Sequence, residues 1–193
     1  MTESIEAARS ALLVMDYQKD IVQRIGDDAL VDRANTAIAA ARAAGSHVGW
    51  VRVALDDADF AAVPSTSVFA GLADPERRAA MHADAPGTQI DERLEVRPED
   101  ASVRKIRVGS FTTTDLGQQL ADRGVDTIVL AGISTSGVVL STVREAMDRD
   151  YRIVVLSDGC ADPDPETHAF LTERIFPRYA SVITVAELSS LWA

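Results

Sequence analysis

Short runs of apolar, largely β-branched residues alternate along the chain with segments in which apolar residues recur at helical spacing. Each run is almost continuously apolar and is bounded by turn residues, which is typical of strands buried on both faces. The runs predict six strands: Ala11–Asp16, His47–Val53, Ser102–Arg107, Thr127–Ala131, Arg152–Leu156 and Ser181–Thr184.

The segments between the predicted strands favour helices. They are Asp27–Ala44, Thr114–Arg123, Ser136–Asp150 and Asp164–Ile175. Gly45 and Gly124 stand where the first two should end. Strands that alternate with helices in this way predict parallel pairing through right-handed crossovers. We therefore expect an α/β protein, a three-layer α/β/α sandwich with a mostly parallel, Rossmann-like sheet of about six strands.

One long stretch, from Ala54 to Asp100, has no clean periodicity. It contains four of the seven prolines, namely Pro64, Pro75, Pro86 and Pro98. Loops of this size are usually functional lids or oligomer contacts, and the pattern predicts one short helix inside it, around Pro75–His82. No linker interrupts the chain, so residues 1–193 are expected to form a single domain.

Composition narrows the classes of function. The 193 residues are 47% hydrophobic, which excludes disorder, and a net charge of −11 argues against nucleic acid as a partner. The lone cysteine, Cys160, excludes an internal disulfide or a Cys-rich zinc cluster and is typical of a reducing compartment. The apolar run ALLVM near the start is too short to span a membrane. We expect a cytoplasmic protein without membrane partners.

Candidate chemistry lies where the predicted strands end, because ligands of open parallel sheets bind beyond the carboxyl ends of the strands. Asp16 ends the first strand, Lys105 lies in the third, and the turn AGISTSG follows the fourth. Taken singly, each has a structural explanation, since strand-end Asp residues often cap turns and a Lys among Arg residues can be solvated. The chain lacks G-x-G-x-x-G after the first strand and lacks a P-loop. No nucleotide cofactor is therefore expected.

The wording and spacing of several segments resemble the isochorismatase-like hydrolases, which include nicotinamidases and related cysteine hydrolases. The segments are ALLVMDYQ, VRKIRVGSF, DTIVLAGISTSGVVLSTVREAMDRDY, VVLSDGCAD and HAFLTERIFPRYASVITVAEL. They span nearly the whole chain. The resemblance implies a parallel-sheet α/β/α sandwich, in agreement with the strand pattern, and assemblies that are homodimers or larger.

The resemblance also implies a catalytic set of Asp, Lys and Cys. Asp16 and Lys105 match the first two members, but the Cys position falls on Val138. Valine has no nucleophilic atom, so the covalent route of the amidase members is closed. Cys160 follows a different strand, and we interpret it as a small buried hydrophobe. For the turn, the resemblance implies a cis peptide between Ile133 and Ser134. The backbone N–H groups of Ser134 and Val138 are then expected to be available to an oxyanion.

A metal site is not expected. Nicotinamidases resemble one another in an Asp and two His after the second strand, whereas this chain has an acidic run without His, at Asp56, Asp57 and Asp59. We interpret that run as a solvated loop. The three histidines, His47, His82 and His168, are scattered along the sequence.

These features favour the chemistry that the resemblance to the true isochorismatases implies. Those enzymes have Gly at the Cys position and hydrolyse a vinyl ether. We expect Asp16 to act as general acid or base on a small anionic metabolite and Lys105 to tune its charge and bind an anionic group. Val138 is bulkier than Gly and narrows the space for the same substrate. Tyr17, Arg52 and Phe111 are candidate pocket walls.

Two other functions stay open at this point. One is a noncatalytic binding or assembly protein that keeps the hydrolase fold. The other is an amidase with Ser134, Ser136 or Ser141 as a substitute nucleophile.

Overall fold

The computed structural model describes residues 5–192 and contains one sheet of parallel strands. The strands run in the order β3-β2-β1-β4-β5-β6. They are β1 (Ser10–Met15), β2 (His47–Val53), β3 (Ala101–Lys105), β4 (Thr127–Ile133), β5 (Arg152–Ala161) and β6 (Ser181–Ile183). The α/β class predicted from the sequence is confirmed.

Helices cover both faces of the sheet. The α-helices are α1 (Lys19–Ile25), α2 (Asp28–Ala44), α3 (Asp57–Ala61), α4 (Pro75–Met81), α5 (Leu116–Asp122), α6 (Leu140–Asp148) and α7 (Pro165–Phe170). The shorter helical turns are η1 (Ala7–Arg9), η2 (Val68–Ala73), η3 (Pro86–Thr88), η4 (Thr135–Val139), η5 (Leu171–Ile175), η6 (Phe176–Arg178) and η7 (Val185–Ser190), of which η4 and η5 are π-helical. The last two helices expected from the sequence are thus each divided between an α-helix and a π-helical turn.

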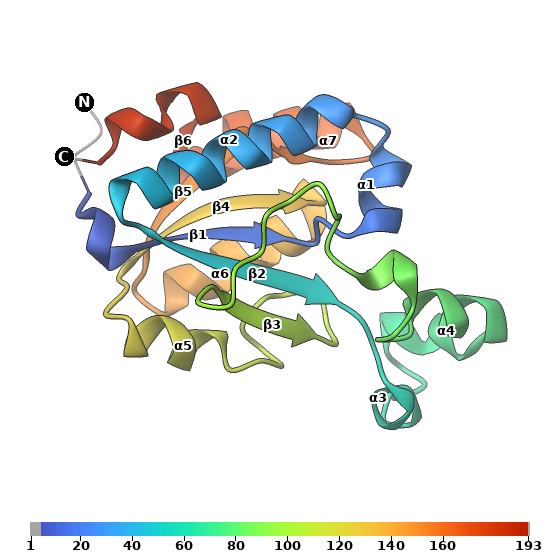
Figure 1. Ribbon diagram of the computed structural model, residues 1–193. Helices are drawn as coiled ribbons and strands as arrows, with labels where there is room; N and C mark the ends of the chain where they lie inside the picture. The colour runs from blue at the N-terminus through green and yellow to red at the C-terminus, as the bar shows by residue number, and fades with distance from the viewer. Residues whose placement is uncertain (1–4, 193) are drawn as a thin grey trace.

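Two apolar clusters fill the space on either side of the sheet. Figure 1 shows α2 on one side, with α5 and α6 on the other. The first cluster joins α2 and η7 to the sheet, and the second joins α5 and α6 to its opposite face. Gly45 ends α2 with a φ of 82°, and Gly124 follows α5 with a φ of 68°, as their positions in the sequence predicted. Among residues 5–192, no helix has both the length and the apolar character needed to cross a bilayer.

Strand β5 is longer than its apolar run. It continues through polar residues to Ala161, with a register shift between Leu130 and Gly132 of β4, after which Cys160 pairs with Gly132. Helix α1 was not expected from the sequence. It begins after Gln18, whose side chain caps nothing, so the usual N-terminal signal is missing.

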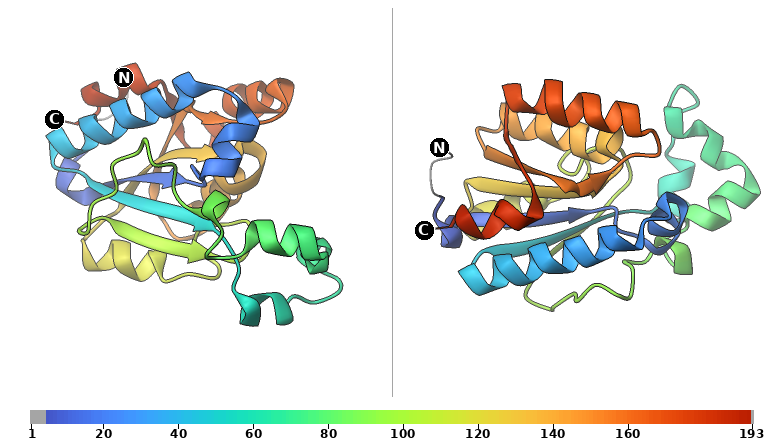
Figure 2. Two further views of the ribbon diagram at one scale, coloured as in Figure 1. Left: turned by 45° about the vertical axis from the view of Figure 1, so that its right-hand side comes forward. Right: turned by 90° about the horizontal axis from the view of Figure 1, so that it is seen from above.

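Most of the stretch between β2 and β3, including α3 and α4, projects beyond the carboxyl ends of the strands, and its last part runs back along the sheet to β3, as Figures 1 and 2 show. It holds α3, η2, α4 and η3, and α4 confirms the short helix expected near Pro75. The acidic run is not the solvated loop that its sequence indicated. Asp56 and Asp59 form a capping box at the start of α3, and both pair with Arg104.

Candidate active site

A cavity of about 280 Å³ lies where β1, β2, β3 and β4 end. Four strand ends, α1, the projecting stretch and η4 contribute its walls. The lining residues are Asp16, Ile21, Arg24, Ile25, Val53, Phe69, Met81, Lys105, Val108, Ile133, Ser134, Gly137, Val138 and Pro163. Asp16, Lys105 and the turn after β4 therefore meet in one place, as the strand-end argument predicts.

Asp16 is held in a conformation that strands do not use. Its φ is 58°, in the left-handed region, immediately after the last residue of β1. Its N–H still donates to the carbonyl of Val51 at 2.8 Å. Two residues on, the Gln18 amide clamps the backbone N–H and carbonyl of Val53. The chain is thus fixed to β2 on both sides of the turn that aims the Asp16 carboxylate.

Lys105 ends β3 and is buried beside that carboxylate. Its Nζ lies 2.9 Å from Asp16 Oδ2 and donates to the carbonyl of Arg107 at 3.2 Å. Asp16 is 5% exposed and Lys105 is 2% exposed, so water does not screen the pair as it would a surface ion pair. Asp16 Oδ1 is buried without a hydrogen-bond partner among the described residues. A buried acceptor left open in this way marks where a proton or a ligand hydrogen bond can be placed.

Burial raises the pKa of Asp16 to about 6, and the charge and hydrogen bond of Lys105 oppose that rise. A carboxyl group with this pKa is partly protonated near neutral pH and can donate a proton or accept one. Desolvation together with a specific charge partner in a cavity is characteristic of acid–base sites.

The turn after β4 carries polar backbone toward the cavity. The Ile133–Ser134 peptide bond is cis, and the Ser134 side chain lines the cavity. The Ser134 carbonyl accepts hydrogen bonds from the N–H groups of Gly137 and Val139, while Ser136 donates from its N–H and its hydroxyl to Asp162. None of these bonds uses the Val138 N–H.

Val138 presents hydrocarbon to the cavity at the first turn of this segment. It is 2% exposed and belongs to the apolar cluster on the α5–α6 side. Cys160 lies in the same cluster but does not line the cavity, and burial raises its pKa to about 12. The thiol is therefore protonated at physiological pH and inert as a nucleophile.

Three expected pocket-wall residues do not line the cavity. Tyr17 is fully buried in the α2-side cluster, with its hydroxyl donating to the Gly159 carbonyl. Arg52 alternates with Val51 and Val53 along β2 and therefore points to the opposite face, where it reaches the carbonyls of Ala83 and Thr88.

Phe111 is the third of these residues. It packs in the α5–α6 cluster, stacked on Tyr151 with ring centroids 5.7 Å apart. Phe111 is therefore part of the hydrophobic core on the α5–α6 side of the sheet and does not contribute to the cavity.

Of the cavity residues that the sequence did not single out, three come from α1. Ile21, Arg24 and Ile25 are spaced at i, i+3 and i+4, so they share one face of the helix. That spacing was readable in the segment DIVQRIG. Phe69 and Met81 come from the projecting stretch, where no sequence pattern indicates which side chains turn inward.

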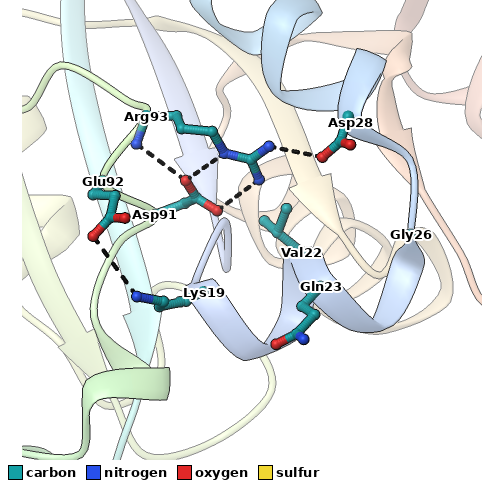
Figure 3. Close-up of a pocket in the computed structure, with 8 residues that line it drawn as sticks. All are labelled: Lys19, Val22, Gln23, Gly26, Asp28, Asp91, Glu92 and Arg93. Atoms are coloured by element: carbon teal, nitrogen blue, oxygen red, sulfur yellow. Dashed lines mark hydrogen bonds and ion pairs between the residues drawn. The ribbon is translucent and has the colours of Figure 1, made fainter.

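A larger cavity, of about 480 Å³, lies between α1 and the chain around Asp91 (Figure 3). Its charged side chains are already paired with one another. Arg93 bonds both Asp91 and Asp28, and Lys19 lies 3.7 Å from Glu92. The candidate chemistry therefore belongs to the smaller cavity, where a buried carboxylate oxygen is open.

Over residues 5–192, no group of three or more His, Cys, Asp or Glu side chains is arranged to hold a metal ion. His168 Nδ1 lies 2.8 Å from Thr135 Oγ1.

Comparison with known proteins shows the family of the fold that holds this cavity. Residues 10–187 match the Isochorismatase domain model. The chain belongs to the isochorismatase family. It is 34% identical over 195 residues to the uncharacterized isochorismatase family protein YecD of Escherichia coli O157:H7, covering 95% of this chain and 96% of that protein.

Two other relatives broaden the comparison within the isochorismatase family. The chain is 29% identical over 182 residues to ureidoacrylate amidohydrolase RutB of Methylorubrum extorquens, covering 84% of this chain and 73% of that enzyme. A solved isochorismatase family protein from Burkholderia thailandensis superimposes with a TM-score of 0.81 at 28% identity, over 99% of this chain and 98% of that one.

Proposed function

We propose that this isochorismatase family protein hydrolyses the vinyl ether bond of a small anionic metabolite, with Asp16 as the general acid and base. The observation that carries the proposal is the buried Asp16 carboxyl at the cavity wall. Its Oδ2 is held by Lys105, its Oδ1 is open, and its pKa is raised to about 6. Such a group can deliver a proton to carbon and take one back.

The reaction begins with a proton from Asp16. Transfer to the terminal alkene carbon forms a C–H bond and uses the π electrons, leaving an oxocarbenium ion on the ether carbon. Water then adds to that carbon, and its extra proton passes to the Asp16 carboxylate. The hemiketal collapses to a carbonyl compound and an alcohol. Water is consumed, and Asp16 ends protonated as it began.

The groups around Asp16 have distinct roles in this scheme. Lys105 stabilises the carboxylate that exists between the two proton transfers, since its ammonium lies 2.9 Å from Oδ2. The Ser134 hydroxyl and the Val138 N–H are candidate donors to the departing oxygen. Val138 takes no covalent part, and the buried thiol of Cys160 is outside the cavity.

Amide hydrolysis is the chemistry named for the RutB relative. A covalent route of that kind needs a nucleophile beside the Asp–Lys pair, and Val138 supplies none. Of the three serines considered as substitutes, only Ser134 lines the cavity. Among the described residues no histidine is hydrogen-bonded to the Ser134 hydroxyl, because His168 is paired with Thr135 Oγ1, which does not line the cavity. The vinyl ether reaction needs only an acid and water.

A noncatalytic binding protein with the same fold is the remaining alternative. It would keep the cavity but would not need a carboxyl that changes protonation near pH 6. The experiment is a turnover screen of the wild-type protein, pretreated with iodoacetamide, against 4-vinyloxybenzoate, ethyl benzoate and benzamide. We expect acetaldehyde and 4-hydroxybenzoate from the first and no products from the others. Release of ammonia from benzamide, or no turnover of any compound, would overturn the proposal.

A further inference from the structure

Arg24 gives the cavity a second charged position besides the Asp16–Lys105 pair. It lies in the last turn of α1, on the face that also presents Ile21 and Ile25 to the cavity. Its side chain is exposed, whereas Asp16 and Lys105 are buried. The charge of Arg24 therefore lies at the solvent side of the cavity and the reactive pair lies at the inner side.

Arg24 has no ionic or hydrogen-bonding partner among residues 5–192. Many of the other arginines are paired, for example Arg93 with two aspartates and Arg104 with two more. The charged side chains that line the cavity are Asp16, Lys105 and Arg24. When Asp16 is ionised it and Lys105 neutralise each other, and Arg24 then supplies the remaining positive charge at the cavity, in a chain of net charge −11.

Apart from Ser134, the uncharged side chains that line the cavity are apolar. They include Ile21 and Ile25 of α1, Ile133 and Val138 around the turn after β4, and Phe69 and Met81 of the projecting stretch. A ligand that reaches both ends must therefore have a hydrocarbon middle, because a polar middle would lose its hydrogen bonds to water without replacement.

We propose that Arg24 is the specificity-determining residue and binds a carboxylate at the end of the substrate remote from the reacting bond. The substrate class is then a small monoanion with an apolar body between its carboxylate and its vinyl ether. A guanidinium is suited to this, since it can hold a carboxylate through two parallel hydrogen bonds. The inference rests on the proposed function for the reacting end alone.

A purely structural role for Arg24 is the competing explanation, and the test must distinguish it. A cation in the last turn of a helix interacts favourably with the helix dipole. Arg174 supplies the matched control. It is the basic residue in the last turn of η5, is exposed, has no partner within the described part of the chain, and lies outside the cavity. Arg24→Gln and Arg174→Gln change the net charge equally.

The test measures binding of two probes that lack a vinyl ether, 4-ethoxybenzoate and 4-ethoxybenzamide, by isothermal titration calorimetry. These compounds have the same shape and differ in charge at one end. Wild type and Arg174→Gln are expected to bind the benzoate roughly 10-fold more tightly than the benzamide, as for one charge-assisted interaction. For Arg24→Gln the Kd values of the two probes should differ by no more than about twofold, because the substitution weakens binding of the benzoate and leaves binding of the benzamide unchanged.

The proposal is overturned if Arg24→Gln keeps the preference, if Arg174→Gln loses it equally, or if wild type does not prefer the benzoate. Neither probe contains a vinyl ether, so these outcomes are independent of the proposed reaction. A protein that binds as expected but leaves 4-vinyloxybenzoate intact would support the role of Arg24 and refute the proposed reaction. If the protein hydrolyses 4-vinyloxybenzoate but Arg24→Gln still prefers the benzoate probe, the proposed reaction would be supported and the role of Arg24 refuted.

Discussion

Lys105 reaches Asp16 across an intervening strand. The two residues belong to β3 and to the end of β1, and β2 lies between them in the sheet. Adjacent strands are about 4.8 Å apart, so the gap is roughly two spacings. The four-carbon stem of lysine covers it and places Nζ 2.9 Å from Asp16 Oδ2. The ion pair forms at the carboxyl edge of the sheet, where the left-handed turn at Asp16 and the end of β3 bring the two side chains together.

This relationship predicts the effect of removing the ammonium. Lys105→Met keeps the length of the side chain and removes the charge and hydrogen bond that lower the pKa of Asp16. The pKa of Asp16 should therefore rise above its value of about 6. A general acid works while protonated, so the fall in kcat with increasing pH should move to higher pH, and maximal kcat should decrease.

The measurement is the pH–rate profile for 4-vinyloxybenzoate in wild type and Lys105→Met. Lys19→Met is the control, because Lys19 is half-exposed beside Glu92 and lies outside the catalytic cavity. Its profile should match wild type. A Lys105→Met profile that stays in place or moves to lower pH would contradict the assigned roles.

Folding stability should also record the Asp16 pKa. The native value of about 6 lies above the ordinary value of 3.8, so between these values the native state binds more protons than the unfolded state. The Asp16 contribution to the free energy of unfolding is then fully present below about pH 4 and falls as pH rises to about 6. The loss is on the order of 2–3 kcal/mol.

Denaturant unfolding of wild type and Asp16→Asn between pH 4 and pH 7 checks this prediction. The other carboxylates are common to both proteins, so their pH dependence cancels in the difference. The stability of wild type relative to Asp16→Asn should decrease across this range. A difference that is constant or increases would show that Asp16 does not titrate as described.

Hydrolysis by wild type should not depend on a thiol, whereas the variant Val138→Cys should gain a reactive one. Iodoacetamide and Cys160→Ala should leave turnover of 4-vinyloxybenzoate unchanged, because the Cys160 thiol is buried with its pKa raised to about 12. Val138→Cys places a thiol in the cavity near the Lys105 ammonium, which lowers a thiol pKa. That variant should react with iodoacetamide and gain ammonia release from benzamide. Loss of wild-type turnover on alkylation would contradict the cysteine-free route.

The sequence predicted the positions of the strands more accurately than the residues at which they end. Apolar runs located every strand because burial on both faces leaves a strong pattern. The end of β5 was not predicted because Ser157 and Asp158 are residues typical of turns. The strand continues beyond them with a register shift relative to β4, between Leu130 and Gly132. Such an irregularity depends on the neighbouring strand and leaves no local signal.

The site was predictable to the extent that strand ends define it. Asp16 and Lys105 follow from that rule and meet in the cavity. Arg52 was misplaced although the alternation of Val51 and Val53 along the strand already assigned it to the opposite face. Phe69 could not be predicted, since it enters the cavity from a proline-rich stretch whose path is set by tertiary packing.

The central claim is that Asp16 donates the proton in a reaction that needs no nucleophile. The direct test compares kcat of wild type and Asp16→Asn with 4-vinyloxybenzoate at pH 6, together with the Kd of 4-ethoxybenzoate for both proteins. Asparagine keeps the shape and removes the exchangeable acid, so kcat should fall by about 10²–10⁴-fold while Kd stays within about threefold. Equal turnover by the two proteins, or no turnover by wild type that binds the probe, would contradict the claim.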